Sequence, residues 1–121
     1  MSRPILEEAQ IHSAIRTKVE GFQQAIVSEV QTAIKAHAVV VVGMRQNPFP
    51  KKACKALATA GVAHHYIEYG SYLGMWRQRL ALKIWTGWPT IPMVFVKGML
   101  VGGYEDLQKL IDSGELKTLM G

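Results

Sequence analysis

Four consecutive valines, Val39 to Val42, restrict the fold of this chain more than any other feature. β-branched residues favour strands, and an apolar run without polar alternation is typical of a strand that is covered on both faces. Such a strand lies inside a sheet and needs helices on either side of it. The run therefore predicts the central strand of an α/β domain.

The residues around the valines predict alternating elements. Apolar side chains recur every three or four positions from Ile11 to Ile34, which predicts a short helix before Gly21 and a firmer helix from Phe22 to about Ala36. After the valines, the patterns predict in order a loop at 43–50, a helix ending at Gly61, a strand at 64–68, a helix at 75–85, a hairpin around Lys97-Gly98, and a helix at 104–112 followed by a short helical turn. This order predicts a mixed four-stranded sheet between helices, with the first two strands parallel.

The loop segment GMRQNPFP follows the carboxyl end of the valine strand. Its two prolines cannot donate backbone hydrogen bonds, so we expect the next helix to begin after them, in KKACKALATAG. Ligands of layered α/β sheets gather at the carboxyl ends of strands and at the N-termini of the helices beside them. The sequence therefore predicts a ligand site at this loop.

Composition excludes several kinds of site. The 121 residues include one cysteine, Cys54, so an intramolecular disulfide, a Cys-x-x-Cys pair and a zinc cluster are excluded. His64 and His65 are neighbours on a predicted strand and face opposite sides, so we expect no metal site. No apolar stretch approaches the roughly 20 residues that span a bilayer, and we expect a soluble, cytoplasmic protein without membrane contact. The net charge of +5 suits anionic ligands, but no RNA-binding signature accompanies it, so nucleic acid is not expected.

Two segments resemble the glutaredoxin family. VVVVGMRQNPFPKKACKALATAGV is similar, without a gap, to the family's strand, active loop and first core helix. WTGWPTIPMVFVKGMLVGGYEDLQKLIDSGELKTLM is similar to the monothiol branch, with its WP-T-x-P segment, GG turn and SGEL ending. The resemblance implies a thioredoxin-like three-layer sandwich with a four-stranded mixed sheet in residues 22–121, preceded by a helical extension in residues 1–21.

The resemblance also implies a ligand groove beside the active loop. Pro92 would be the cis proline of the fold, although only about 5 to 6% of X–Pro bonds in folded proteins are cis. It would expose backbone groups of Thr90 and Ile91 to an extended ligand. The resemblance likewise implies that the backbone of Ile91 would pair with the cysteinyl part of glutathione.

The two ends of glutathione would meet different elements. Gly103, Tyr104 and Glu105 would hold its γ-glutamyl end at a helix N-terminus, where backbone N–H groups favour a carboxylate. Arg79 matches the monothiol position that holds the glycine carboxylate, and its planar guanidinium suits that role. A surface arginine without a ligand is the alternative for Arg79.

The chain departs from the family at the reactive position. The family's Cys-Pro-Tyr-Cys falls on Asn47, Pro48, Phe49 and Pro50. Thiol–disulfide exchange needs a thiolate, and a carboxamide offers none, so the dithiol reaction is excluded and Asn47 and Phe49 become groove side chains. Met44 stands where the family usually has a lysine, and the neighbouring Arg45 could replace that lysine or point away.

Cys54 allows two interpretations. In the gapless alignment it lies seven residues after Asn47, about two helical turns away, and is a small core residue. In a gapped alignment it begins the helix and becomes a monothiol nucleophile, but the helix to Gly61 is then only about two turns long.

Three functions follow from these alternatives. The first is a module that binds glutathione or an extended peptide without reacting with it. The second is an oxidoreductase in which Cys54 carries out monothiol transfer or, in a dimer, helps to ligate an iron–sulfur cluster, which we do not expect. The third is a partner-binding scaffold that uses the N-terminal helices and the basic surface. The sequence leaves the oligomeric state open.

Overall fold

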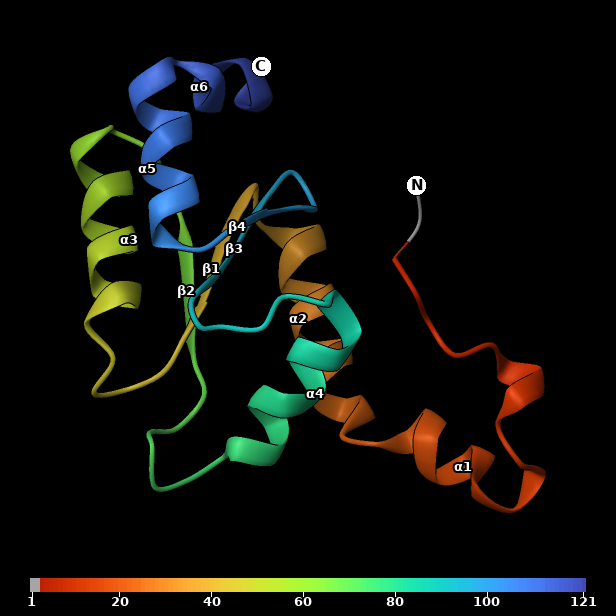
Figure 1. The fold of residues 1–121 in the computed structure, drawn as a ribbon. Helices are drawn as coiled ribbons and strands as arrows, with labels where there is room; N and C mark the ends of the chain where they lie inside the picture. The colour runs from red at the N-terminus through yellow and green to blue at the C-terminus, as the bar shows by residue number, and fades with distance from the viewer. Residues whose placement is uncertain (1–2) are drawn as a thin grey trace.

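A computed structural model describes residues 3–121, which form a four-stranded sheet between helices (Figure 1). The elements in chain order are η1 (Glu8–Gln10), α1 (Ser13–Gly21), α2 (Gln24–Ala36), β1 (Val39–Gly43), α3 (Pro48–Thr59), β2 (His65–Glu68), α4 (Trp76–Thr86), β3 (Met93–Val96), β4 (Met99–Gly102), α5 (Tyr104–Ser113) and α6 (Glu115–Met120). The predicted order of elements is confirmed, and the chain is of the α/β class.

The strand order is β2-β1-β3-β4, so the valine strand is an inner strand of the sheet. β1 runs parallel to β2 and antiparallel to β3, and β3 and β4 form a hairpin. All five residues of β1 are buried, as an unbroken apolar run predicts. The turn at Lys97 and Gly98 has φ of 53° and 80°, the positive values that two-residue hairpin turns require.

Helices cover both faces of the sheet (Figure 1). Val40 and Val42 pack with the residues of α2 and α4 in one core, which includes Leu82. Val39 and Val41 face the other way and pack in a second core formed with α3, α5 and α6. Successive side chains of a strand point to opposite faces, so one run of valines supports two cores. This is the three-layer sandwich that the resemblance implied.

The N-terminal helix α1 lies apart from the sheet (Figure 1). Each residue of α1 is at least partly exposed, whereas α2 buries Ile26, Val30 and Ala33. The segment before α1 returns to the domain, because a Cβ atom on Gly87 would lie 2.8 Å from the guanidinium carbon of Arg3. The division of the chain at residue 21 stays a prediction.

The start of α3 corrects the sequence analysis. The helix begins at Pro48, inside the segment predicted to be a loop. Asn47 is its N-cap residue, and Pro48 occupies the first turn. The N–H groups of a first turn have no acceptor within the helix, so the missing donor of a proline is no obstacle there. The expectation that the prolines delay the helix was therefore wrong.

Candidate functional site

Three elements meet beside the carboxyl end of β1: the N-terminus of α3, the loop from α4 to β3 and the N-terminus of α5. A cavity of about 490 Å³ lies between them and is called the groove below. The lining residues are Met44, Asn47, Phe49, Tyr72, Lys83, Trp88, Pro89, Thr90, Ile91, Pro92, Gly103, Tyr104, Glu105 and Asp106. The structure thus brings the predicted ligand-binding residues together, except Arg45 and Arg79.

A glycine allows α3 to start close to the sheet. A Cβ atom on Gly43, the last residue of β1, would lie 2.7 Å from the Cβ of Pro50 and from the ring of Tyr66. Real Cβ atoms essentially never approach other atoms so closely, so a larger residue would push the first turn of α3 away from β1. Gly43 therefore fixes the depth of this wall of the groove.

Asn47 joins two walls of the groove. Its side-chain oxygen accepts a hydrogen bond from the backbone N–H of Phe49 at 3.0 Å, which caps α3. Its side-chain nitrogen donates to the carbonyl oxygen of Ile91 at 3.2 Å, 44 residues along the chain. One carboxamide thus fastens the start of α3 to the loop that precedes β3.

The Ile91–Pro92 peptide bond is cis, as the resemblance implied. Ile91 and Pro92 are both buried, and the carbonyl oxygen of Ile91 accepts the hydrogen bond from Asn47 at the start of α3. Thr90 on the same loop is exposed and lines the groove. The backbone of this loop is therefore presented along one side of the cavity.

The N-terminus of α5 forms the facing wall. The carboxylate of Asp106 accepts a hydrogen bond from the N–H of Gly103 at 3.1 Å, so this donor is already satisfied. Tyr104 and Glu105 follow in the first turn, where backbone N–H groups lack acceptors within the helix. The indole nitrogen of Trp88 is buried beside Gly103 and has no hydrogen-bond partner within residues 3–121. This wall therefore combines backbone and indole N–H donors with the carboxylates of Glu105 and Asp106.

Arg79 lies outside the groove, which corrects the role carried over from the resemblance. Its side chain is only 7% exposed, and one guanidinium nitrogen donates to the carbonyl oxygens of Tyr69 at 2.9 Å and Gly74 at 2.6 Å. Lys83 lines the groove instead. It follows Arg79 by four residues, so the two share one side of α4, and this spacing was the signal that could have found it.

Arg45 also lies outside the residues that line the groove. Its guanidinium approaches the carboxylate of Glu68 at 3.8 Å, and both side chains are exposed. Met44 lines the groove instead, so an apolar side chain stands beside the reactive position of the family. Exposed ion pairs contribute little to stability, and Arg45 remains available to a partner in solution.

Cys54 lies in the middle of α3 and away from the groove. It is partly buried and packs against the second core, as do Tyr66 and Val62. Burial raises the pKa of its thiol, which disfavours the thiolate. Since α3 begins at Pro48, the gapped alignment that put Cys54 at the start of the helix was wrong.

Residues 3–121 contain no cluster of three or more side chains of the metal-binding types. None of their helices is both long enough and apolar enough to cross a membrane.

The sheet order, the helices on both faces and the cis proline opposite the start of α3 define a thioredoxin-like domain. Comparisons with known proteins agree with this class. The sequence profile of the glutaredoxin family matches residues 39–101. A "Glutaredoxin-like protein" of Dictyostelium discoideum is 45% identical over 98 residues, which are 81% of this chain and 80% of that protein. Glutaredoxin 4 of Buchnera aphidicola is 27% identical over 100 residues, with 78% and 91% covered.

Solved structures show the same fold. Oxidized glutaredoxin 2 from Chlamydomonas reinhardtii superposes with a TM-score of 0.70 at 25% identity and covers 81% of this chain and 92% of that one. A buckwheat glutaredoxin-glutathione complex superposes with a TM-score of 0.71 at 21% identity, with 84% and 92% covered. The chain belongs to the glutaredoxin family.

Proposed function

We propose that the groove binds glutathione, or an extended peptide of similar size, and releases it chemically unchanged. The observation that carries the proposal is the position of Asn47: an amide stands at the mouth of a groove whose remaining walls are formed. An amide cannot attack a disulfide, so binding and release are the chemistry left to this site.

Backbone donors and Lys83, together with the carboxylates of Glu105 and Asp106, support an extended ligand that carries charges of both signs. The first turn of α5 offers N–H groups to a carboxylate at one end of the groove. Lys83 supplies a positive charge to a second carboxylate. The loop of Ile91 offers its backbone between them, as an extended peptide requires. The buckwheat structure with a similar fold is a glutathione complex, which agrees with the proposed ligand.

The lone thiol takes no part in this proposal. Cys54 lies outside the groove, and burial raises its pKa, so neither monothiol transfer nor cluster ligation at the groove is proposed. We propose the cytoplasm as the location, because a free cysteine persists in a reducing compartment.

A titration of the ¹⁵N-labelled protein with reduced glutathione tests binding. Shifts confined to the amides of Ile91, Tyr104 and Glu105, with saturation at millimolar ligand, would support the proposal. No shift at that concentration would refute it. A parallel assay should find no reduction of a glutathione mixed disulfide, because turnover would show that a nucleophile operates.

A further inference from the structure

Six large apolar side chains gather on the surface next to the groove. They are Tyr72, Leu73, Met75, Trp76, Leu80 and Ile84, called the apolar patch below. Leu73 is 93% exposed, Tyr72 64% and Trp76 55%. Trp76, Leu80 and Ile84 are spaced by four residues and so lie on one side of α4. Large apolar side chains exposed this densely along one loop and one helix face are typical of an interaction site.

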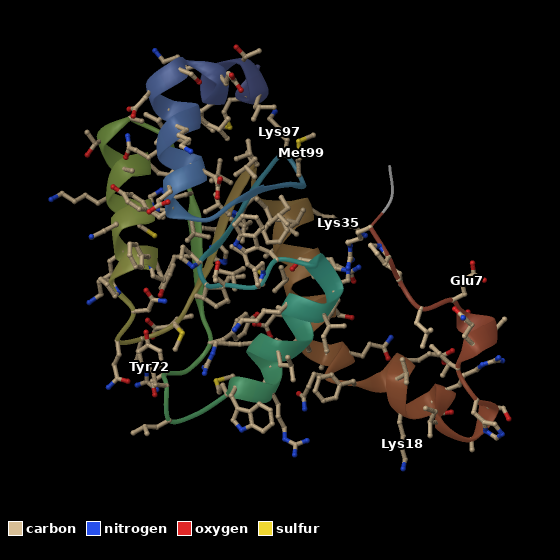
Figure 2. The ribbon with its side chains drawn as sticks, viewed as in Figure 1. Glu7, Lys18, Lys35, Tyr72, Lys97 and Met99 are labelled. Carbon is tan, nitrogen blue, oxygen red and sulfur yellow. The ribbon has the colours of Figure 1, made fainter. Side chains whose placement is uncertain are left out.

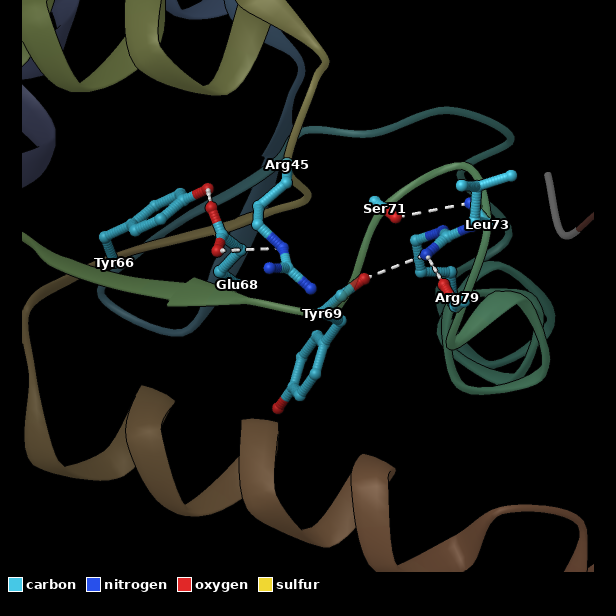
Figure 3. Close-up of polar contacts among 8 residues, drawn as sticks. Arg45, Tyr66, Glu68, Tyr69, Ser71, Leu73 and Arg79 are labelled. Carbon is cyan, nitrogen blue, oxygen red and sulfur yellow. Dashed lines mark hydrogen bonds and ion pairs between the residues drawn. The ribbon is translucent and has the colours of Figure 1, made fainter.

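The loop that carries Leu73 is held in place by a buried arginine. Arg79 donates from one nitrogen to the carbonyls of Tyr69 and Gly74, the two ends of the loop (Figure 3). No carboxylate pairs with Arg79 within residues 3–121. Burying a charge is costly unless hydrogen bonds compensate, and here the compensation goes entirely to the loop backbone.

Further bonds brace the same loop. Ser71 and Gly74 form an isolated bridge, and the hydroxyl of Ser71 accepts from the N–H of Leu73 at 3.2 Å (Figure 3). The hydroxyl of Tyr69 donates to Glu29 of α2 at 2.8 Å. The exposed leucine is therefore held on a fixed scaffold. A partner that binds it loses less conformational entropy than one that must order a mobile loop.

The charged side chains of the patch's own loop and helix have a single sign, while the carboxylates of Glu105 and Asp106 belong to the N-terminus of α5 across the groove. The sequence contains no aspartate or glutamate between Glu68 and Glu105. Arg77 lies over the ring of Trp76, with its guanidinium carbon 5.1 Å from the ring centre. Lys83 stands at the border between the patch and the groove. The patch is thus apolar with a basic border.

This charge pattern decides which occupant fits. Two copies of the patch placed face to face would bring Arg77 and Lys83 of each copy together, in a chain of net charge +5. α1 of a second copy also exposes apolar side chains, Ile15 and Val19, but it carries Arg16 and Lys18 against a single Glu20 and so offers no acidic border. Like charges brought together at an interface oppose association.

We propose that the apolar patch is a docking surface for another protein, which presents an apolar face bordered by aspartate or glutamate side chains. Apolar contact supplies affinity, and the basic border selects an acidic partner. Tyr72 and Lys83 belong to both the patch border and the groove, so a docked partner lies at the groove's edge. The proposal does not depend on what the groove binds.

Two synthetic amphipathic helices test it. Both carry leucine along one face, and the other faces carry glutamate in one peptide and lysine in its counterpart. We expect the acidic peptide to bind at least roughly tenfold more tightly, with amide shifts confined to residues 72–84. The Leu73→Ala/Trp76→Ala double variant should weaken binding by roughly tenfold or more.

Met99→Ala is the matched control. Met99 is 58% exposed on β4, and Figure 2 shows it at the opposite end of the molecule from Tyr72. The control should bind the acidic peptide like the wild type, and the double variant should still bind glutathione if the wild type does. Four outcomes overturn the proposal: no peptide binding, equal binding of both peptides, dimerisation through the patch in sedimentation, or binding to phosphatidylserine vesicles without binding to the acidic peptide.

Discussion

Asn47 is a single residue that carries both structure and chemistry. It caps α3 and is hydrogen-bonded to the loop of the cis proline, two roles that a cysteine at the same place could not fill. A thiol is a weak hydrogen-bond donor and acceptor, and it is not among the preferred N-cap residues. Asparagine in place of the family's cysteine therefore exchanges a reactive group for a structural link between two walls of the groove.

The variant Asn47→Cys should gain monothiol activity. Its sulfur would stand at the N-terminus of α3, where the helix dipole and first-turn N–H groups stabilise a thiolate. A coupled assay that follows reduction of a glutathione mixed disulfide by reduced glutathione should detect turnover in this variant and none in the wild type. The assay is made in a Cys54→Ala background, with Asn47→Ser as the control. An inactive variant that still binds glutathione would contradict the placement of residue 47 beside the ligand.

The variant Asn47→Ala should lose stability. It removes an N-cap, which typically contributes about 1 kcal/mol, together with the bond to Ile91. We expect the free energy of unfolding in urea to fall by about 1 to 2 kcal/mol.

Asn47→Asp separates the two bonds, since a carboxylate still caps the helix but has no hydrogen to donate to Ile91. The free energy of unfolding of the aspartate variant should therefore lie between those of the wild type and the alanine variant. Equal stability of all three proteins would show that neither bond contributes.

Lys83 should matter more for ligand binding than for folding. Lys83→Gln removes its charge from the groove, and the affinity for glutathione should fall by roughly fivefold to thirtyfold, as expected for an interaction of about 1 to 2 kcal/mol between charged groups. Lys52→Gln is the control, since Lys52 lies over the ring of Phe49 and does not itself line the groove. Calorimetry with both variants checks this, and an equal effect of the two changes would indicate only long-range charge.

At the scale of the elements, the sequence predicted the interior better than the boundaries. The valine strand and the Lys97-Gly98 turn were recognisable because a buried strand and a two-residue hairpin each need specific residue types. The start of α3 was not predicted correctly, although an asparagine followed by a proline, as at Asn47 and Pro48, is a pattern typical of helix starts. Prolines are common in loops, but their position relative to the N-cap decides whether a helix can begin with them.

Removal of residues 1–21 should leave the domain folded. No residue of α1 is buried, and the residues that form or pack against the two cores begin at Phe22. The truncated protein should keep a cooperative thermal transition, with a midpoint within about 8 °C of the full chain, which corresponds to about 1 kcal/mol. Circular dichroism during heating measures this. Loss of the cooperative transition would show that the extension belongs to the folded unit.

At the scale of the whole molecule, the sequence located the groove but not all of its charges. The resemblance to the glutaredoxin family correctly predicted that Pro92 and Gly103 lie at the groove. Their positions depend on the path of the backbone, which the fold determines. Arg79 occupies the family's position in the chain, yet it bonds two carbonyls of the preceding loop, while Lys83 one turn later reaches the groove. The direction of a long side chain depends on which acceptors lie near it, and that is decided by a loop of this chain's own sequence.

A groove with a carboxamide at the family's reactive position does not change covalently when redox conditions change. A cysteine in that position passes between thiol, mixed disulfide and oxidised acids as its surroundings change. The carboxamide of Asn47 follows none of these conversions. The covalent state of the groove is then independent of peroxide and of the ratio of disulfide to thiol around the protein, and only non-covalent contacts can hold a ligand there.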